Sequence, residues 1–198
     1  MAPEIFKPVR TIQCAASGNF CEWTDGKVVV EQSVNLTING DNWLSLICTP
    51  HEIDALAVGF LYNEGIIQSI DEIVSCHVIP TYDQVDIRLN HSTIRPDHWH
   101  RTTTTLTGAM GGNPDVWRAP CRNEILLEPA EVPQLFRKFI LMQTLHNQVG
   151  GFHSAALSDG REIHMVVEDI GRHNTLDKIA GLILLNNLGS EPRVILIS

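Results

Sequence analysis

The order of apolar patterns in the second half of the chain restricts its fold more than any other feature. Apolar residues at helical spacing occupy Pro133–Val149 and Leu176–Leu188, and short apolar strand patterns occupy His153–Leu157, Ile163–Val167 and Val194–Ile197. A succession of helix, two strands, helix and strand is typical of a sheet covered by helices. We therefore predict a three-layer α/β arrangement. Because no element follows the last strand, we expect this layered fold to be truncated at its C-terminus.

An α+β portion is predicted ahead of these layers. Apolar residues alternate along Lys27–Asn39, an Asn-Gly pair supplies a tight turn, and Trp43–Ile47 returns as the second strand of a hairpin. Two further strands are expected at Ile73–Ile79 and Val85–Leu89. The sequence thus places several strands before the region in which helices dominate.

One helix in this portion has marked boundaries. Thr49 is the expected N-cap, Pro50 the first helical residue, and Glu52 the partner that completes a capping box. An apolar stripe follows, and Gly65 is expected to end the helix.

The 198 residues suggest one domain, or two small units that share a core. We divide the chain into an N-terminal extension (1–26), an N-terminal α+β subdomain (27–100) and an α/β subdomain (101–198). The polar segment Asn90–Glu131 joins the two subdomains. Loops of that length in a compact domain usually serve a function.

Charge and hydropathy exclude several classes of protein. The net charge is −9 with 14 basic residues and no basic stretch, which argues against a protein that coats nucleic acid. No apolar run approaches the ~20 residues that span a bilayer. The first ten residues lack the apolar core of a signal peptide, so we expect a cytoplasmic protein.

Five cysteines are scattered along the chain, at Cys14, Cys21, Cys48, Cys76 and Cys121. An odd number at irregular spacing, without a CxxC pair, predicts free thiols and no zinc site built from cysteines alone. Cys121 is the one cysteine within the long polar segment, and the arginines on either side of it favour a thiolate nucleophile. The alternative is an incidental exposed thiol.

The densest polar segment is Glu168–Lys178, between a predicted strand and a predicted helix. Ligands bind at the carboxyl ends of strands in open α/β sheets, and helix N-termini attract anions. Gly171 lets the backbone approach a ligand, Arg172 can grip a phosphate, and His173 can move a proton near neutral pH. The alternative is a capped helix whose Asn174 and Asp177 satisfy its own first turn.

A second small-residue segment, Gly150–Ala156, leads into a strand, and its His153 is a candidate site residue. The alternative is a hydrogen-bonded core histidine. Zinc deaminases combine H-x-E with a later P-C-x-x-C. Here Ala155 occupies the place of the glutamate and Glu124 that of the second cysteine, and the two segments come in the reverse order. We therefore reject zinc deamination.

Three stretches together resemble the formate dehydrogenase accessory sulfurtransferase family (FdhD/NarQ). They are the helix segment Thr49–Ile67, which resembles "TP…LAvGFL…EGII", the strand entry Gly150–Ala155, which resembles "TGG-[FLV]-H-x-A", and Glu168–Lys178, which resembles the signature "EDvGRHNAvDK". The last is eleven residues long and nearly complete, and the three occur in the family's order over roughly residues 30–198.

The resemblance implies a cytidine-deaminase-like α/β fold without bound zinc. It also implies a homodimer and a sulfurtransferase that accepts persulfide sulfur from a cysteine desulfurase. That sulfur passes to the molybdenum bis(guanine dinucleotide) cofactor, the bound substrate, which formate dehydrogenase needs; a guanine nucleotide could mimic it. We predict catalytic roles for Cys121 and His173, and cofactor contacts from Gly151, His153, Asp169, Gly171, Arg172 and Asn174.

The chain departs from the family pattern in two places. The family carries one or two cysteines in a Ser/Thr-rich loop, whereas the matching loop here, Thr102–Gly112, has none. The family also continues beyond the final strand, where this chain stops at Ser198. A second interpretation therefore stays open: a non-catalytic chaperone that binds the molybdenum cofactor or guanine nucleotide and has lost sulfur transfer.

Overall fold

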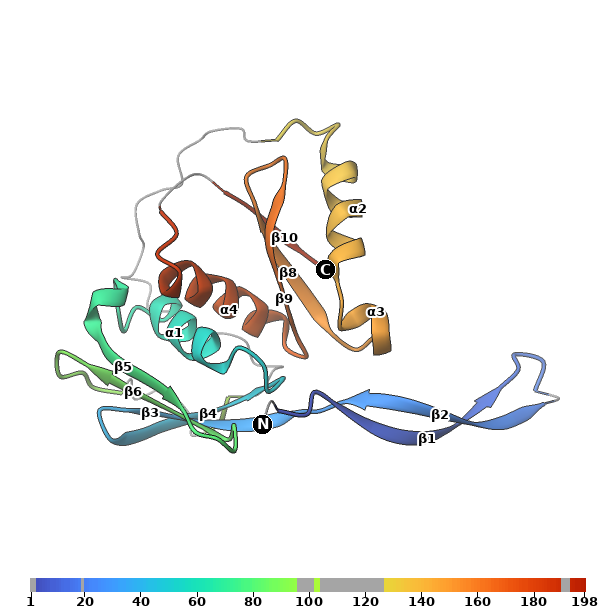
Figure 1. The fold of residues 1–198 in the computed structure, drawn as a ribbon, viewed down its shortest axis with the longest axis horizontal. Coiled ribbons are helices and arrows are strands. Elements are labelled where there is room, and N and C mark those ends of the chain that lie inside the picture. Colours follow the sequence, from blue (N-terminus) through green and yellow to red (C-terminus); the bar gives the residue numbers. More distant parts are fainter. Residues whose placement is uncertain (1–2, 19, 96–101, 104–126, 190–192) are drawn as a thin grey trace.

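Two β-sheets enclose a pair of helices that pack against each other (Figure 1). The structure is a computed structural model that describes residues 3–18, 20–95, 102–103, 127–189 and 193–198. From the first sheet outward, the layers are a five-stranded sheet, helix α1, helix α4, a three-stranded sheet and helix α2. A long two-stranded ribbon projects to one side. The prediction of a mixed α/β protein is confirmed.

The five-stranded sheet has the order β5-β6-β3-β4-β7. Its strands are β3 (Gln32–Ile38), β4 (Asp41–Cys48), β5 (Ile73–Val78), β6 (Gln84–Leu89) and β7 (Thr102–Thr103). Neighbours β3 and β4 are antiparallel, whereas β3 and β6 are parallel, because α1 and β5 lie between them along the chain. The Asn39-Gly40 turn that joins β3 to β4 has positive φ at both residues, as the hairpin prediction required.

The single strand predicted at Lys27–Asn39 is wrong. The chain leaves one sheet and enters another at Val30 and Glu31, so that β2 (Cys21–Val29) ends before β3 begins. Strand β2 pairs with β1 (Phe6–Cys14) along its whole length, and this ribbon occupies a region for which the sequence predicted no element. Alternating apolar residues cannot reveal that successive parts of one run pair with different partners.

Helix α1 (Ile53–Asn63) packs its apolar side on this sheet, and the short 3₁₀ helix η1 (Ile70–Glu72) leads from it into β5. Gly65, with φ of 74°, follows the helix end as predicted. The predicted capping box is wrong: Glu52 precedes the helix in the left-handed region, with φ of 52°, and no side chain caps it. The Thr49 hydroxyl is occupied elsewhere, as described below.

The second half contains α2 (Val132–Met142), α3 (His146–Val149), β8 (His153–Ser158), β9 (Ile163–Asp169), α4 (Arg172–Leu185) and β10 (Val194–Ile197). The three strands are antiparallel in the order β10-β8-β9, with α4 on one face and α2 on the other. The helix–sheet–helix layers agree with the prediction. The finer cytidine-deaminase-like arrangement, the truncation and the subdomain boundaries stay predictions.

Helices α1 and α4 touch through their backbones. A Cβ atom on Gly59 of α1 would lie 1.7 Å from the carbonyl oxygen of Asp177. A Cβ atom on Gly181 of α4 would lie 1.9 Å from the carbonyl oxygen of Ala55. Only glycine permits such an approach, so this contact fixes where α4 begins and therefore where the signature segment lies.

None of the helices within the described ranges is both long enough and apolar enough to cross a membrane.

Candidate functional site

The candidate site lies where β9 ends, α4 begins and β8 starts. His153 is the register partner of Asp169, and directly opposite residues share one face of a sheet. The chain end joins them, because the Ser198 amide donates to the Ser154 carbonyl at 3.0 Å. The structure thus brings His153, Asp169 and the start of α4, all named as candidates from the sequence, to one edge of the sheet.

Asp169 is fully buried, and several donors satisfy its carboxylate. Its Oδ2 lies 2.8 Å from Lys178 Nζ and accepts the Thr49 amide at 3.1 Å. Its Oδ1 accepts the Gly171 amide at 2.8 Å and Asn174 Nδ2 at 2.7 Å. The Lys178 side chain has no exposed surface either. A buried charge persists only when it is paired and hydrogen-bonded, so this carboxylate is the scaffold of the turn.

The same scaffold joins the two halves of the molecule. The Ile170 amide donates to the Thr49 hydroxyl at 3.1 Å, and Asn174 Nδ2 donates to the Ile47 carbonyl at 2.9 Å. These bonds explain why Thr49 does not cap α1: its hydroxyl accepts from the β9–α4 turn instead. Of the predicted cofactor-contacting residues, Asp169 and Asn174 therefore direct polar atoms to protein partners.

Glu168 fixes the segment between α2 and α3. Its carboxylate accepts the amides of Leu145 at 2.7 Å and His146 at 2.8 Å, and the Thr144 hydroxyl at 3.1 Å. An anion at the start of a helix is favoured by the free amides there. This contact also explains why the single helix predicted at Pro133–Val149 is wrong: the chain breaks after Met142 and turns toward Glu168.

Two predicted residues remain available at the start of α4. Arg172, the first residue of the helix, is exposed. The His173 side chain is half-buried, and its Nδ1 atom is buried without a hydrogen-bond partner among the described residues. The first amides of a helix have no acceptor within that helix. An exposed cation and an imidazole therefore lie in the first turn of a helix, a place that can receive an anion.

The glycine pair ahead of β8 shapes the rim of the site. Gly150 and Gly151 have φ of 75° and 76°, a region that side-chain-bearing residues rarely adopt. A Cβ atom on Gly150 would meet nothing within 4 Å, so the backbone is open there. His153 is exposed, and its Nδ1 lies 3.4 Å from the Ser198 carbonyl oxygen. His153 is thus a rim residue and not a buried core histidine.

Among the described cysteines, none presents a reactive thiol at this edge of the sheet. Burial raises the pKa of the Cys48 thiol, and the Asp169 charge adds to the effect. Burial likewise raises the pKa of Cys76 to about 12. The prediction of free thiols is wrong for Cys14 and Cys21, which form a disulfide because the ribbon makes them direct cross-strand partners. Cys121 and the Thr102–Gly112 loop, except Thr102 and Thr103, lie outside the described residues.

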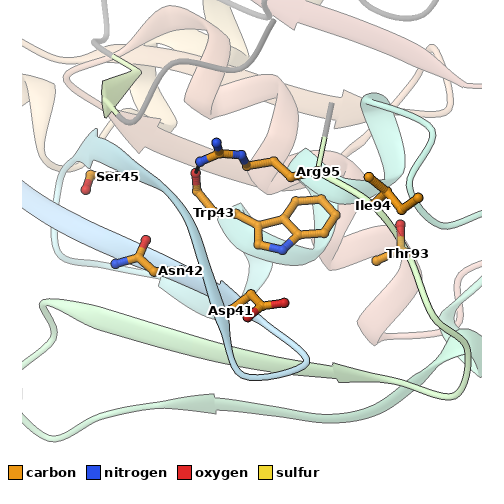
Figure 2. Close-up of a pocket in the computed structure, with 7 residues that line it drawn as sticks. All are labelled: Asp41, Asn42, Trp43, Ser45, Thr93, Ile94 and Arg95. Atoms are coloured by element: carbon orange, nitrogen blue, oxygen red, sulfur yellow. Dashed lines mark hydrogen bonds between the residues drawn. The ribbon is translucent and has the colours of Figure 1, made fainter. Parts of the chain in front are cut away.

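A cavity of about 850 Å³ lies at the opposite end of β4, and no motif in the sequence pointed to it. Figure 2 shows the seven residues that line it: Asp41, Asn42, Trp43, Ser45, Thr93, Ile94 and Arg95. Arg95 Nη1 donates to the Trp43 carbonyl at 3.0 Å. Strand β4 runs from this cavity to Thr49 at the candidate site.

Within the part of the chain that the structure describes, no three His, Cys, Asp or Glu side chains come together as ligands for a metal ion.

Comparison with known proteins places these features in a family. Residues 29–198 match the model of the FdhD/NarQ family. "Sulfur carrier protein FdhD" of Staphylococcus haemolyticus is 29% identical over 189 residues, which cover 91% of this chain and 70% of that protein. The protein of the same name from Shouchella clausii is 30% identical over 187 residues, covering 88% and 68% of the two chains.

A solved structure shares the fold. The crystal structure of a protein from Desulfotalea psychrophila, named provisionally as a formate dehydrogenase accessory protein, superposes with a TM-score of 0.74. The superposition covers 98% of this chain and 75% of the other, at 21% sequence identity. At that identity the likeness supports the fold alone.

Proposed function

Because the chain belongs to the FdhD/NarQ family, we propose that it is an accessory sulfurtransferase for formate dehydrogenase. In this proposal it takes persulfide sulfur from a cysteine desulfurase and passes it to the molybdenum bis(guanine dinucleotide) cofactor. The nearly complete signature at Glu168–Lys178, inside a family match over residues 29–198, carries the proposal. We propose further that the protein acts in the cytoplasm as a homodimer.

The geometry suggests how the cofactor, as the substrate, would be held. The diphosphate groups of a guanine dinucleotide are anions, and the exposed Arg172 at the first turn of α4 is suited to them. Gly151 and Gly171 bring backbone close to the same edge, and His153 lies on its rim. Asp169 and Asn174 would support cofactor binding indirectly, because their hydrogen bonds hold the turn in place.

The sulfur-carrying thiol is proposed to be Cys121. Cys48 and Cys76 are disfavoured since burial raises their pKa values, and a persulfide forms from a thiolate. The disulfide removes Cys14 and Cys21 from the thiolate pool in the observed state. Arg118 and Arg122 flank Cys121 in the sequence and would favour its thiolate form.

Intact mass with peptide mapping tests this proposal. The protein is incubated with a cysteine desulfurase and cysteine, and we expect a reducible gain of one sulfur atom on Cys121. The Cys121→Ser variant should lose that gain and should not restore formate dehydrogenase in cells that lack the accessory protein. A folded wild-type chain that gains no sulfur would favour the alternative, a cofactor-binding chaperone without sulfur transfer.

The proposed anion role of Arg172 is tested by calorimetry with a guanine nucleotide. A charge-assisted hydrogen bond contributes about 1.5–3 kcal/mol, so Arg172→Ala should weaken binding at least about tenfold. Arg161→Ala, in the exposed turn between β8 and β9, is the matched control and should bind as the wild type does. Equal affinity of both variants would refute the role of Arg172.

A further inference from the structure

The free end of the β1–β2 ribbon carries the disulfide between Cys14 and Cys21. The two residues are the last register pair of the ribbon, their Cα atoms are 4.1 Å apart, and both are exposed. The family match begins at residue 29, so family membership assigns no role to this pair. An exposed cross-strand pair can be opened and closed by an incoming thiol without disturbing a core.

The ribbon has two unlike faces. Directly opposite residues share a face and successive pairs alternate, so the disulfide lies on the same face as the Ile12–Trp23 pair. Ile12 is 54% and Trp23 60% exposed, and the Arg10 guanidinium lies 5.2 Å from the Trp23 ring centroid. The opposite face carries Gln13–Glu22 and the hydrogen-bonded hydroxyls of Thr11 and Thr24.

The base of this ribbon adjoins the candidate site. The Phe6 ring meets the Phe152 ring edge to face, with centroids 6.0 Å apart. Val29, the register partner of Phe6, would lie 3.6 Å from a Cβ atom on Gly151. Because side chains alternate along a strand, Phe6 and Val29 lie on the face of the ribbon that bears the disulfide. The ribbon therefore extends from the glycine pair of the site to the disulfide at its free end. Figure 1 shows β1 and β2 projecting away from the rest of the molecule.

We propose that Cys14 and Cys21 form a second sulfur-handling site, which resolves a persulfide into hydrosulfide and the observed disulfide. The partner is a protein that presents a cysteine persulfide, and it docks on the apolar side chains of Ile12 and Trp23 beside the sulfur atoms. The inference rests on the proposed supply of persulfide sulfur. It adds a site on a part of the chain that the family match does not reach.

The chemistry starts from the reduced pair. One thiolate attacks the outer sulfur of the partner's persulfide, a new S–S bond forms, and the partner leaves as a thiolate. The second cysteine then attacks the inner sulfur of the new persulfide, and the outer sulfur leaves as hydrosulfide. Two thiols are oxidised to one disulfide while one sulfane sulfur is reduced to sulfide. A dithiol reductant returns the pair to its starting state through a mixed disulfide.

The test uses the full chain carrying Cys121→Ser, so that its outcome does not depend on the proposed carrier cysteine. The protein is reduced, freed of reductant and mixed with glutathione persulfide, and hydrosulfide and peptide masses are followed. We expect one hydrosulfide per chain and a Cys14–Cys21 disulfide. Adding Cys14→Ser or Cys21→Ser should abolish this release and leave one reducible sulfur on the remaining cysteine of the pair.

A chain with Cys14, Cys21 and Cys121 all changed to serine measures the background. Release no faster than from that chain would overturn the inference, even if wild-type Cys121 accepts sulfur. Conversely, a missing sulfur gain on Cys121 together with hydrosulfide release from the pair would overturn only the proposed carrier role. The two failures are thus distinguishable.

The docking face is tested with a persulfide-loaded cysteine desulfurase as donor. Exposed aromatic anchors often dominate a protein interface, so Trp23→Ala should slow release roughly tenfold with this donor and leave release from glutathione persulfide unchanged. Val74→Ala, at a residue 62% exposed on β5, is the matched control and should have no effect. Equal rates for both variants with the protein donor would overturn the docking face.

Discussion

Within the signature segment, buried and exposed side chains have separate tasks. Asp169, Asn174 and Lys178 satisfy one another and hold the turn. Arg172 is exposed at the start of α4, where a ligand can reach it. A sequence motif of this density therefore combines a buried structural ion pair with an exposed cation, which is the residue proposed to contact the anion. The capped-helix interpretation of the segment is wrong, because no side chain caps α4. Asn174 donates to Ile47 and Asp169, and the Asp177 carboxylate accepts from Asn63 on α1.

Removal of Lys178 should destabilise the protein strongly. Lys178→Met leaves the Asp169 carboxylate buried and without its cation, which typically costs about 3–5 kcal/mol. Urea denaturation followed by circular dichroism measures the free energy of unfolding. The control is Lys138→Met, whose partner Glu162 is largely exposed and whose ion pair should contribute no more than ~1 kcal/mol. Similar losses in both variants would contradict the structural role of the buried pair.

Asp177 should make stability depend on pH. Burial raises the pKa of this carboxyl from 3.8 to about 7, an effect that Asn63 opposes through its hydrogen bond and that the charges of Glu64 and Asp169 increase. Between these values the folded chain binds more protons than the unfolded chain. The free energy of unfolding should therefore decrease as the pH rises from about 4 to about 7.

Urea denaturation of wild type and Asp177→Asn at several pH values measures this contribution. The variant should lose less stability than the wild type over the same pH interval. Asp54→Asn, at an exposed position in the first turn of α1, should retain the wild-type slope. Parallel curves for the wild type and Asp177→Asn would show that this carboxyl does not titrate as described.

At the scale of elements, the contact between α1 and α4 should tolerate no side chain larger than hydrogen. Gly181→Ala would place a methyl group 1.9 Å from a backbone oxygen, so the helices would have to separate. Overpacking costs about 1–3 kcal/mol and more where backbone must move. Thermal unfolding should show a large decrease in the midpoint. Gly189→Ala has nothing within 4 Å of the added carbon and should leave that midpoint nearly unchanged.

The elements that the sequence predicted well are those whose boundaries depend on neighbouring residues. The Asn39-Gly40 turn and the helix stop at Gly65 need only local φ preferences, and β10 matches its predicted range. The errors arise from distant partners. The Thr49 hydroxyl accepts the Ile170 amide, and the Glu168 carboxylate binds the segment after Met142, where α2 ends. Neither contact can be predicted from the spacing of neighbouring residues.

At the scale of the whole molecule, the order of elements in the sequence predicted the helix layers on the three-stranded sheet, but it did not predict the β1–β2 ribbon. Strands β1 and β2 pair with each other along their whole length, and Ile12 and Trp23 are exposed there. Alternation of apolar and polar residues reveals a strand only when one of its faces is buried, and most side chains of this ribbon are exposed. Candidate residues for this region could be named from the sequence, but the donors from Thr49 and Lys178 that hold the turn could be found only in the fold.

The bonds between Thr49 and the β9–α4 turn also determine how late during synthesis this turn can fold. The Thr49 amide and its acceptor on Asp169 are 120 residues apart. A ribosome adds ~5–20 residues each second, so roughly 6–24 s pass between the synthesis of the two. During that interval the face of α1 that contains Gly59 is not yet covered by α4. The β9–α4 turn can therefore form these bonds only after both of the segments that it joins have been synthesised.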